Sequence, residues 1–183
     1  MSAASIPRLF TVEEFEQLAD PPNGHFELHH GEVVLVTPPI HSHKLLQRRL
    51  RILLEDMADT NGCVADTEYA YRPLPESEVW VGDVVCISAA REAQIIQWLE
   101  GSPELVIEVK SRTNTKDQLH DKAMTTLAGR GSVEFWIVSP ETEAVTVYTK
   151  TSGVHVYRRS IEQTVPLSIF SGHILLDQLF SEP

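Results

Sequence analysis

Three ionisable residues stand among apolar neighbours in two segments that are typical of buried strands. Asp83 lies in VWVGDVVCIS, and Glu108 and Lys110 lie in ELVIEVKS. Burying an isolated charge is costly, so such groups tend to be paired, protonated or bound to a metal. Because side chains alternate along a strand, Glu108 and Lys110 face the same way, about 7 Å apart. These residues fit two interpretations, salt bridges at strand ends or a metal-dependent active site.

In the second interpretation the two carboxylates are the metal ligands. Carboxylates on adjacent strands can share a hard divalent cation, Mg²⁺ or alternatively Mn²⁺, that keeps several of its waters. A lysine beside the ion can orient the attacking water or stabilise charge on a phosphate oxygen. An acid followed about 25 residues later by Glu-x-Lys is the pattern of the PD-(D/E)xK phosphodiesterases. The bare motif also occurs by chance, which leaves the salt-bridge interpretation open.

Periodicity and capping signals predict the elements that must position these residues. The predicted order is a helix over 11–18, a hairpin over 25–36, a helix over 42–60, strands over 63–72 and 79–88, a short helix near 91–99, a strand over 104–111, a helix over 115–129, a strand over 133–140, an antiparallel pair over 144–150 and 153–159, and a closing helix or apolar turn over 174–180. This order predicts an α/β (α+β) fold, with a mixed sheet flanked by helices and an N-terminal helix and hairpin. We expect one domain over residues 1–183.

The overall charge argues against a protein whose whole surface attracts nucleic acid. The chain has 15 Lys and Arg against 26 Asp and Glu, a formal net charge of −11, and phosphates are bound mainly by basic side chains. Nine of the fifteen bases nevertheless fall within residues 44–51 and 110–130. These two segments are either solvated helix faces or parts of a surface where they meet in space.

Cysteine usage and hydropathy indicate the compartment. Cys63 and Cys86 have neither close-pair nor zinc-ligand spacing, so we expect reduced thiols. No segment approaches the ~20 apolar residues of a membrane span, and the first ten residues lack the apolar stretch of a signal peptide. The expectation is a cytoplasmic protein that does not enter a membrane.

Several motifs occur in an order that a known family shares. They are HFELHHGEVVLVTPP, HKLLQRRLRILL, VGDVVCIS, ELVIEVKSRTNTKDQLHDKAMTTL and GSVEFWIVSPETEAVTVY. In this order they resemble the Uma-two family of restriction-endonuclease-like proteins, over about residues 11–150. The resemblance implies the restriction-endonuclease-like fold and a magnesium-dependent nuclease site, and it transfers the fold more securely than the reaction.

The same resemblance implies roles for individual residues. Asp83 would be the first metal-binding acid and Glu108 the second, and the backbone carbonyl of Val109 would add a ligand. Lys110 would orient the attacking water. Lys122 matches a lysine of the following helix that could reach a phosphate, with a solvated helix lysine as the alternative.

Two residues of the N-terminal third also carry competing interpretations. Glu27 matches a recurrent acid of the family at the hairpin, where it would complete the metal site, bind a water or form only a hairpin charge pair. His43 lies on the apolar stripe of the helix over 42–60. A lone histidine there is either a hydrogen-bonded core residue or a group that contacts metal or substrate.

Two function hypotheses follow from these residues. The first is a magnesium-dependent nuclease that hydrolyses phosphodiester bonds in nucleic acid, with DNA as the expected substrate and a homodimer as a plausible assembly. The second, motivated by the acidic net charge, is a non-catalytic module that binds nucleic acid or protein with the same fold.

Overall fold

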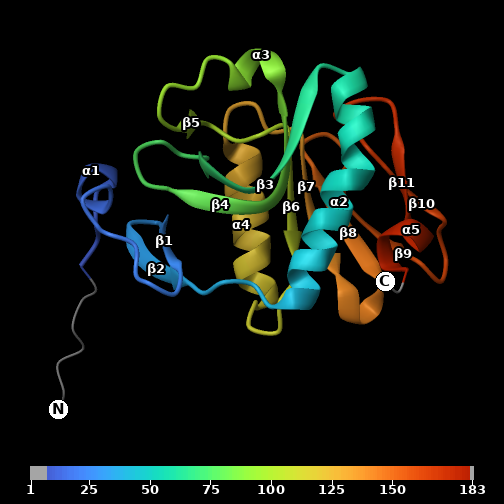
Figure 1. Cartoon of the computed structure of the whole chain (residues 1–183), viewed down its shortest axis with the longest axis horizontal. Coiled ribbons are helices and arrows are strands. Elements are labelled where there is room, and N and C mark those ends of the chain that lie inside the picture. The colour runs from blue at the N-terminus through green and yellow to red at the C-terminus, as the bar shows by residue number, and fades with distance from the viewer. Residues whose placement is uncertain (1–7, 182–183) are drawn as a thin grey trace.

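A computed structural model describes residues 8–181, and Figure 1 shows its architecture. The helices are α1 (Val12–Phe15), α2 (His41–Thr60), α3 (Ala89–Glu92), α4 (Lys116–Ala128) and α5 (Leu176–Phe180), with a 3-10 turn, η1, at Pro140–Thr142. The strands are β1 (His25–His29), β2 (Glu32–Val36), β3 (Cys63–Arg72), β4 (Trp80–Ser88), β5 (Leu99–Glu100), β6 (Leu105–Val109), β7 (Glu134–Ser139), β8 (Ala144–Thr149), β9 (Gly153–Arg158), β10 (Thr164–Pro166) and β11 (His173–Leu175). The predicted mixed α/β architecture is confirmed.

The centre of the fold is a seven-stranded mixed sheet in the order β5-β3-β4-β6-β7-β8-β9. β4 pairs antiparallel with β6, and β6 pairs parallel with β7. Parallel neighbours need a crossover connection, and α4 supplies it between β6 and β7. This crossover carries α4 over the same strands that hold Asp83 and Glu108.

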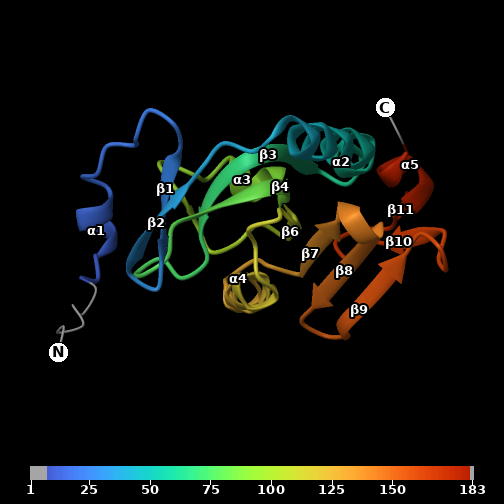
Figure 2. The same cartoon turned by 90° about the horizontal axis from the view of Figure 1, so that it is seen from below.

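Each face of the sheet is covered by one long helix. Figure 2 shows α2 on one side of the sheet and α4 on the other. The core between α2 and the sheet includes Leu50 and Leu54 of the helix with Val84 and Ile107 of the strands, and the core between α4 and the sheet includes Leu119 and Ala123 of the helix with Val85 and Val106 of the strands. Strands covered on both faces need near-continuous apolar sequence, which explains why the charged residues of β4 and β6 stood out.

The β1–β2 hairpin lies beside the start of β4 rather than in the main sheet. Leu28 and Val79 exchange two backbone hydrogen bonds, of 2.8 and 3.0 Å, and Leu28 is fully buried. In Figure 1 the hairpin lies on the N-terminal side of the molecule, away from β9 and the C-terminus. This docking brings Glu27 of β1 against β4.

Most predicted elements are present, and three details differ. α1 ends at Phe15, three residues earlier than predicted, and the helix expected near 91–99 is only the single turn of α3, followed by the short strand β5. The β10–β11 pair was not predicted, because two three-residue strands are too short to show periodicity. The expectation about the first ten residues falls largely on residues 1–7, which with 182 and 183 lie outside the described range.

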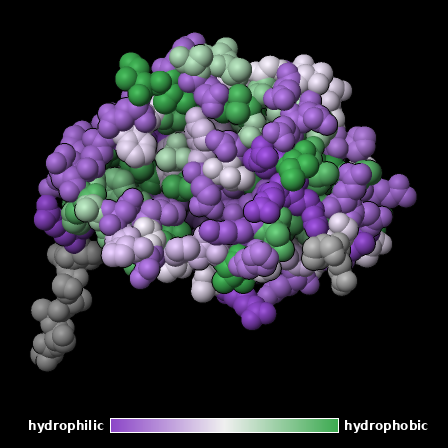
Figure 3. Space-filling view, in the orientation of Figure 1, coloured by the Kyte–Doolittle hydropathy of each residue, from purple (hydrophilic) through white to green (hydrophobic). Residues whose placement is uncertain are grey.

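Two observations concern the surface. Within residues 8–181, none of the helices combines the length and the apolar character needed to span a bilayer. Figure 3 shows hydrophilic and hydrophobic residues mixed over the face that carries α2, with the hydrophobic ones in small separate groups.

Candidate active site

Asp83 and Glu108 lie on neighbouring strands, at the point where the ladder between those strands ends. The last paired residues of β4 and β6 are Val84 and Ile107. Continuing that register places Asp83 opposite Glu108. Beyond that point a side chain replaces the backbone carbonyl as the hydrogen-bond acceptor: Asp83 Oδ2 accepts a 2.6 Å hydrogen bond from the Val109 N–H. The prediction that the two acids occupy adjacent strands is confirmed.

Helix α2 holds the other donors to Asp83. His43 Nε2 lies 3.0 Å from Asp83 Oδ2, and Gln47 Nε2 donates to Asp83 Oδ1 at 2.8 Å. The three-to-four spacing of a helix puts His43 and Gln47 on one face, above β4. His43 is therefore hydrogen bonded to the first proposed metal ligand. Asp83 itself keeps about a fifth of its side chain exposed.

Glu68, on β3, is a third acid beside Asp83 and Glu108, and the three acids form a row across the neighbouring strands β3, β4 and β6. It is opposite Asp83 in the β3–β4 register, at the one position between Thr67 and Tyr69 that forms no bridge. Gln47 Nε2 donates to Glu68 Oε1 at 2.6 Å as well as to Asp83, so one amide joins the two carboxylates. Glu68 has a φ of 54°, in the left-handed region that non-glycine residues seldom adopt.

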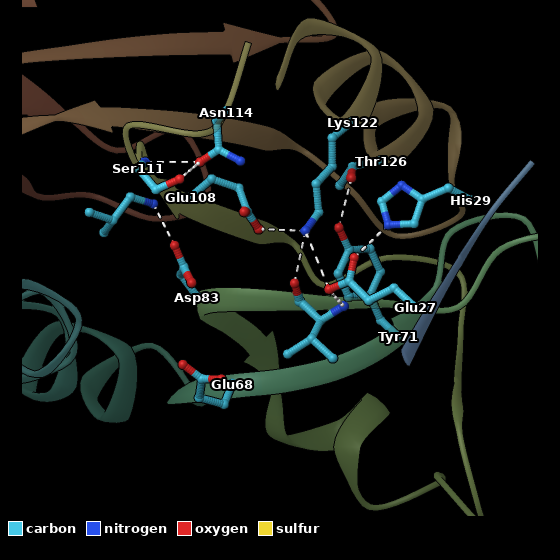
Figure 4. A network of polar contacts seen from close by, with 12 residues as sticks. Glu27, His29, Glu68, Tyr71, Asp83, Glu108, Ser111, Asn114, Lys122 and Thr126 are labelled. Carbon is cyan, nitrogen blue, oxygen red and sulfur yellow. Dashed lines mark hydrogen bonds and ion pairs between the residues drawn. The ribbon is translucent and has the colours of Figure 1, made fainter. Parts of the chain in front are cut away.

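Lys122, on α4, lies over the other side of Glu108. Its ammonium is 3.0 Å from Glu108 Oε1, 2.9 Å from the Val81 carbonyl oxygen and 3.9 Å from Glu27 Oε1. Figure 4 shows Lys122 between Glu108 and Glu27. Lys122 and Glu108 expose only 11% and 12% of their side chains. Lys122 is thus a buried cation rather than a solvated helix lysine.

Glu27 is the most enclosed acid of the group, with 5% of its side chain exposed. Its Oε1 accepts from the Val81 N–H at 3.1 Å, and its Oε2 accepts from His29 Nε2 at 2.6 Å. His29 stacks on Trp80, with ring centroids 5.1 Å apart. The network in Figure 4 therefore joins the hairpin, β4, β6 and α4.

The charges in this network shift one another's pKa values. Burial raises the pKa of Glu108 to about 8, and the nearby negative charges of Asp83 and Glu27 add to the rise, while Lys122 opposes it. Burial acts the same way on Glu27, but Lys122 and its histidine donors outweigh it and hold the Glu27 pKa well below its usual value. The pKa of Lys122 is raised, because Glu108 and Glu27 outweigh its burial.

Lys110 follows β6 directly, and its side chain borders a cleft rather than pairing with a carboxylate of the described chain. Its N–H donates to the Val138 carbonyl at 2.8 Å, and its half-buried side chain lines a cleft with Ser111 and Lys116. Within residues 8–181, no carboxylate lies within 4.0 Å of the Lys110 ammonium. Its role beside the attacking water stays a prediction.

The acids of this network are the groups that could hold the divalent metal that the sequence suggests. Across residues 8–181, no three His, Cys, Asp or Glu side chains converge as a ready-made metal site. The chemistry of the donors nevertheless fits a hard cation, because Asp83 and Glu108 offer carboxylate oxygens and Val109 a carbonyl. Glu108 Oε1 is buried and makes no hydrogen bond of good geometry besides its ion pair with Lys122. The residues present therefore fit a metal held mainly by two carboxylates.

The sequence interpretation missed three residues of this network. Gln47 and Glu68 bridge α2, β3 and β4, and His29 holds Glu27. Gln47 had a detectable signal, since it is one turn after His43 on the same helix face. The position of Glu68 had none, because an acid in a half-exposed strand is common and its neighbours come from distant parts of the chain.

Comparison with known proteins identifies the family and the fold. The Uma2 family model, described as "Putative restriction endonuclease", matches residues 12–174. No curated protein matches the chain. The crystal structure of a protein from Anabaena variabilis ATCC 29413, titled a putative nuclease belonging to DUF820, superposes with a TM-score of 0.81 at 20% identity, covering 94% of this chain and 98% of that one. At that identity the likeness shows the fold alone, whereas the family match spans most of the sequence. The chain therefore belongs to the Uma2 family of restriction-endonuclease-like proteins.

Proposed function

We propose that this protein is a magnesium-dependent nuclease that hydrolyses phosphodiester bonds in nucleic acid, with DNA as its substrate. One observation carries the proposal: Glu108 and Glu27 share a single buried ammonium, Lys122, and Asp83 lies opposite Glu108 on the neighbouring strand, close enough for its charge to raise the Glu108 pKa. Burial and the charges of Asp83 and Glu27 raise the pKa of Glu108, so the site disfavours a further negative charge unless a divalent cation is present to balance it.

Some residues of the site would bind the metal ion, and others would hold those metal ligands in position. Asp83 and Glu108 are the proposed metal ligands, with the Val109 carbonyl beside them. A bound Mg²⁺ supplies Lewis acidity toward a phosphate oxygen and lowers the pKa of a coordinated water. His43 and Gln47 orient Asp83.

The two lysines have separate roles in this proposal. Lys110, next to the carboxylates in sequence and free of an acidic partner in the described part of the chain, orients the attacking water and stabilises charge that develops on the phosphate. Lys122 keeps Glu108 and Glu27 in place and compensates part of their charge. Lys122 thereby acts through Glu108 rather than on the phosphate directly.

The test is cleavage of supercoiled plasmid and of single-stranded DNA, with and without Mg²⁺. We expect Asp83→Asn and Lys110→Ala each to lower the rate by about a hundredfold or more, because each removes a group that acts on the reacting atoms. Asp59→Asn is the matched control, since Asp59 is an exposed acid at the opposite end of α2 from His43. Wild-type rates in both site variants would overturn the mechanism.

The second candidate, a non-catalytic binding module, draws on a different observation. No ready-made three-ligand metal site occurs among the described residues, and the chain is acidic overall. This function predicts binding of DNA without turnover, even at stoichiometric protein and millimolar Mg²⁺. Homodimerisation belongs to the nuclease proposal, since a duplex has two strands to cut, and sedimentation velocity with and without duplex tests it.

A further inference from the structure

A cleft of about 310 Å³ opens beside Lys110, on the face of the sheet that α4 covers only in part. Its walls come from the end of β6, the first turn of α4, the turn η1 and strands β8 and β9. The β8–β9 register pairs Thr146 with Val156 and Ala144 with Arg158, so these side chains lie together on the floor. The cleft is therefore formed by elements that are distant in sequence.

Three of the lining residues are cations: Lys110, Lys116 and Arg158. Seven of the fifteen lysines and arginines form ion pairs with carboxylates, as in the pairs of Arg51 with Glu55 and of Arg91 with Glu104. None of the three cleft cations has a carboxylate within 4.0 Å among residues 8–181. The one acid in the lining is Glu141, which is exposed. Its carboxylate lies 3.6 Å from Arg112, a residue that does not line the cleft.

The cleft adjoins the proposed active site through the loop after β6. Ser111 lines the cleft, and its N–H and hydroxyl donate to Asn114 Oδ1 at 2.9 and 2.7 Å. Figure 4 shows Ser111 and Asn114 close to Glu108. The loop ends at Thr115, whose hydroxyl caps α4 by accepting from the Gln118 N–H at 3.2 Å. This turn and cap hold the backbone of Lys116 at the edge of the cleft.

We infer that this cleft binds the phosphates of the substrate strand next to the scissile one, with Lys116 and Arg158 as the contact residues. The inference rests on the proposed function for its substrate, a phosphodiester chain. Phosphate contacts by Lys and Arg position a nucleic acid without reading its sequence. A strand leaving the carboxylates over Lys110 would meet Lys116 and Arg158, which line the same cleft. The local positive charge also explains how a protein with a net charge of −11 can bind a polyanion.

The test measures binding rather than cleavage. The affinity of the whole protein for a 30-base-pair duplex and for a 30-nucleotide single strand is followed by fluorescence anisotropy over a series of salt concentrations, with EDTA present. For the double variant Lys116→Gln/Arg158→Gln we expect the slope of log K against log salt to fall by about 1 for each lost contact. Affinity at about 0.1 M salt should fall by roughly tenfold per contact.

The matched control is Arg48→Gln/Arg130→Gln. Both arginines are exposed and lie outside the cleft, and the double variant loses the same two charges. A control with the wild-type slope supports the cleft as the binding site. Equal loss of slope in the two double variants, or no loss in either, would overturn it. Thermal unfolding of all variants identifies any change caused by misfolding.

Because the measurement is made without metal, it separates the two proposals. A protein that binds through the cleft but never cleaves DNA would refute the nuclease function and leave the cleft as a phosphate site. If the protein cleaves DNA but the salt dependence of DNA binding is the same in the cleft variant as in wild type, only the proposed phosphate site in the cleft is refuted.

Discussion

Gln47 connects α2 to the acidic row, and its loss should affect metal binding more than folding. Its amide donates to both Asp83 and Glu68. We expect Gln47→Leu to weaken Mg²⁺ binding by about tenfold to a hundredfold, the usual effect of removing a partner that orients a metal ligand. Isothermal titration calorimetry measures the affinity, and Gln94→Leu, at an exposed position after α3, is the control. An unchanged Mg²⁺ affinity would exclude a positioning role for Gln47.

Lys122 should matter to stability as much as to activity. Lys122→Met leaves Glu108 and Glu27 buried without their cation, which we expect to cost about 3–5 kcal/mol of unfolding free energy. Adding Glu108→Gln removes the ionisable group that has lost its ion pair with Lys122 and should recover roughly 1–2 kcal/mol. Urea unfolding of the single and double variants tests this, with the exposed Lys44→Met as control. Additive effects of the two substitutions would show that the ion pair is energetically unimportant.

We expect His30 to make the docking of the hairpin depend on pH. Its backbone N–H donates to both carboxylate oxygens of the buried Glu78, and its ring nitrogens lie 2.9 Å from Glu78 and 2.8 Å from Asp121 of α4. The hydrogen bond with Asp121 and the charges of both acids raise the pKa of His30 above 6.5. A raised pKa means that the folded protein favours the protonated ring. This contribution is complete below the unfolded pKa and is lost as the pH rises through the folded pKa.

The corresponding experiment compares the unfolding free energy of wild type and His30→Gln at about pH 6 and about pH 9. The wild type should be the more stable protein at the lower pH, and the difference should shrink at the higher pH. His41→Gln, exposed at the start of α2, serves as control. A difference that stays constant or grows with pH would contradict the role assigned to His30.

The elements that the sequence predicted well are those with a strong local signal. The apolar stripe of α2 and the Thr115–Gln118 capping box of α4 gave boundaries within a residue or two of those observed. β4 and β6 were recognisable because strands buried on both faces must be apolar, which also isolated Asp83 and Glu108. By contrast, the hairpin docks through contacts between segments that are distant in sequence, such as the two hydrogen bonds between Leu28 and Val79. Local periodicity contains no information about such contacts.

For the whole molecule, the distribution of charge was the feature least accessible from sequence. The two basic segments lie mainly on α2 and α4, which cover opposite faces of the sheet (Figure 2), so they do not form one continuous surface. Lys122 is used inside the protein. The cleft instead combines Lys110 and Lys116 with Arg158, whose place beside them is set by the strand order of the sheet. Counting bases along the chain could not have identified this group.

The backbone conformation of Glu68 has a consequence for anyone who redesigns this protein for stability. A left-handed residue inside a strand is strained by about 1–3 kcal/mol unless it is glycine, so a method that optimises folding energy would choose glycine at position 68. That choice would remove one of the two acceptors that Gln47 holds together. The most stable sequence for this fold and the sequence best suited to binding a cation are therefore expected to differ at this position. Selection for heat resistance alone would therefore tend to replace Glu68 and remove its carboxylate from the candidate site.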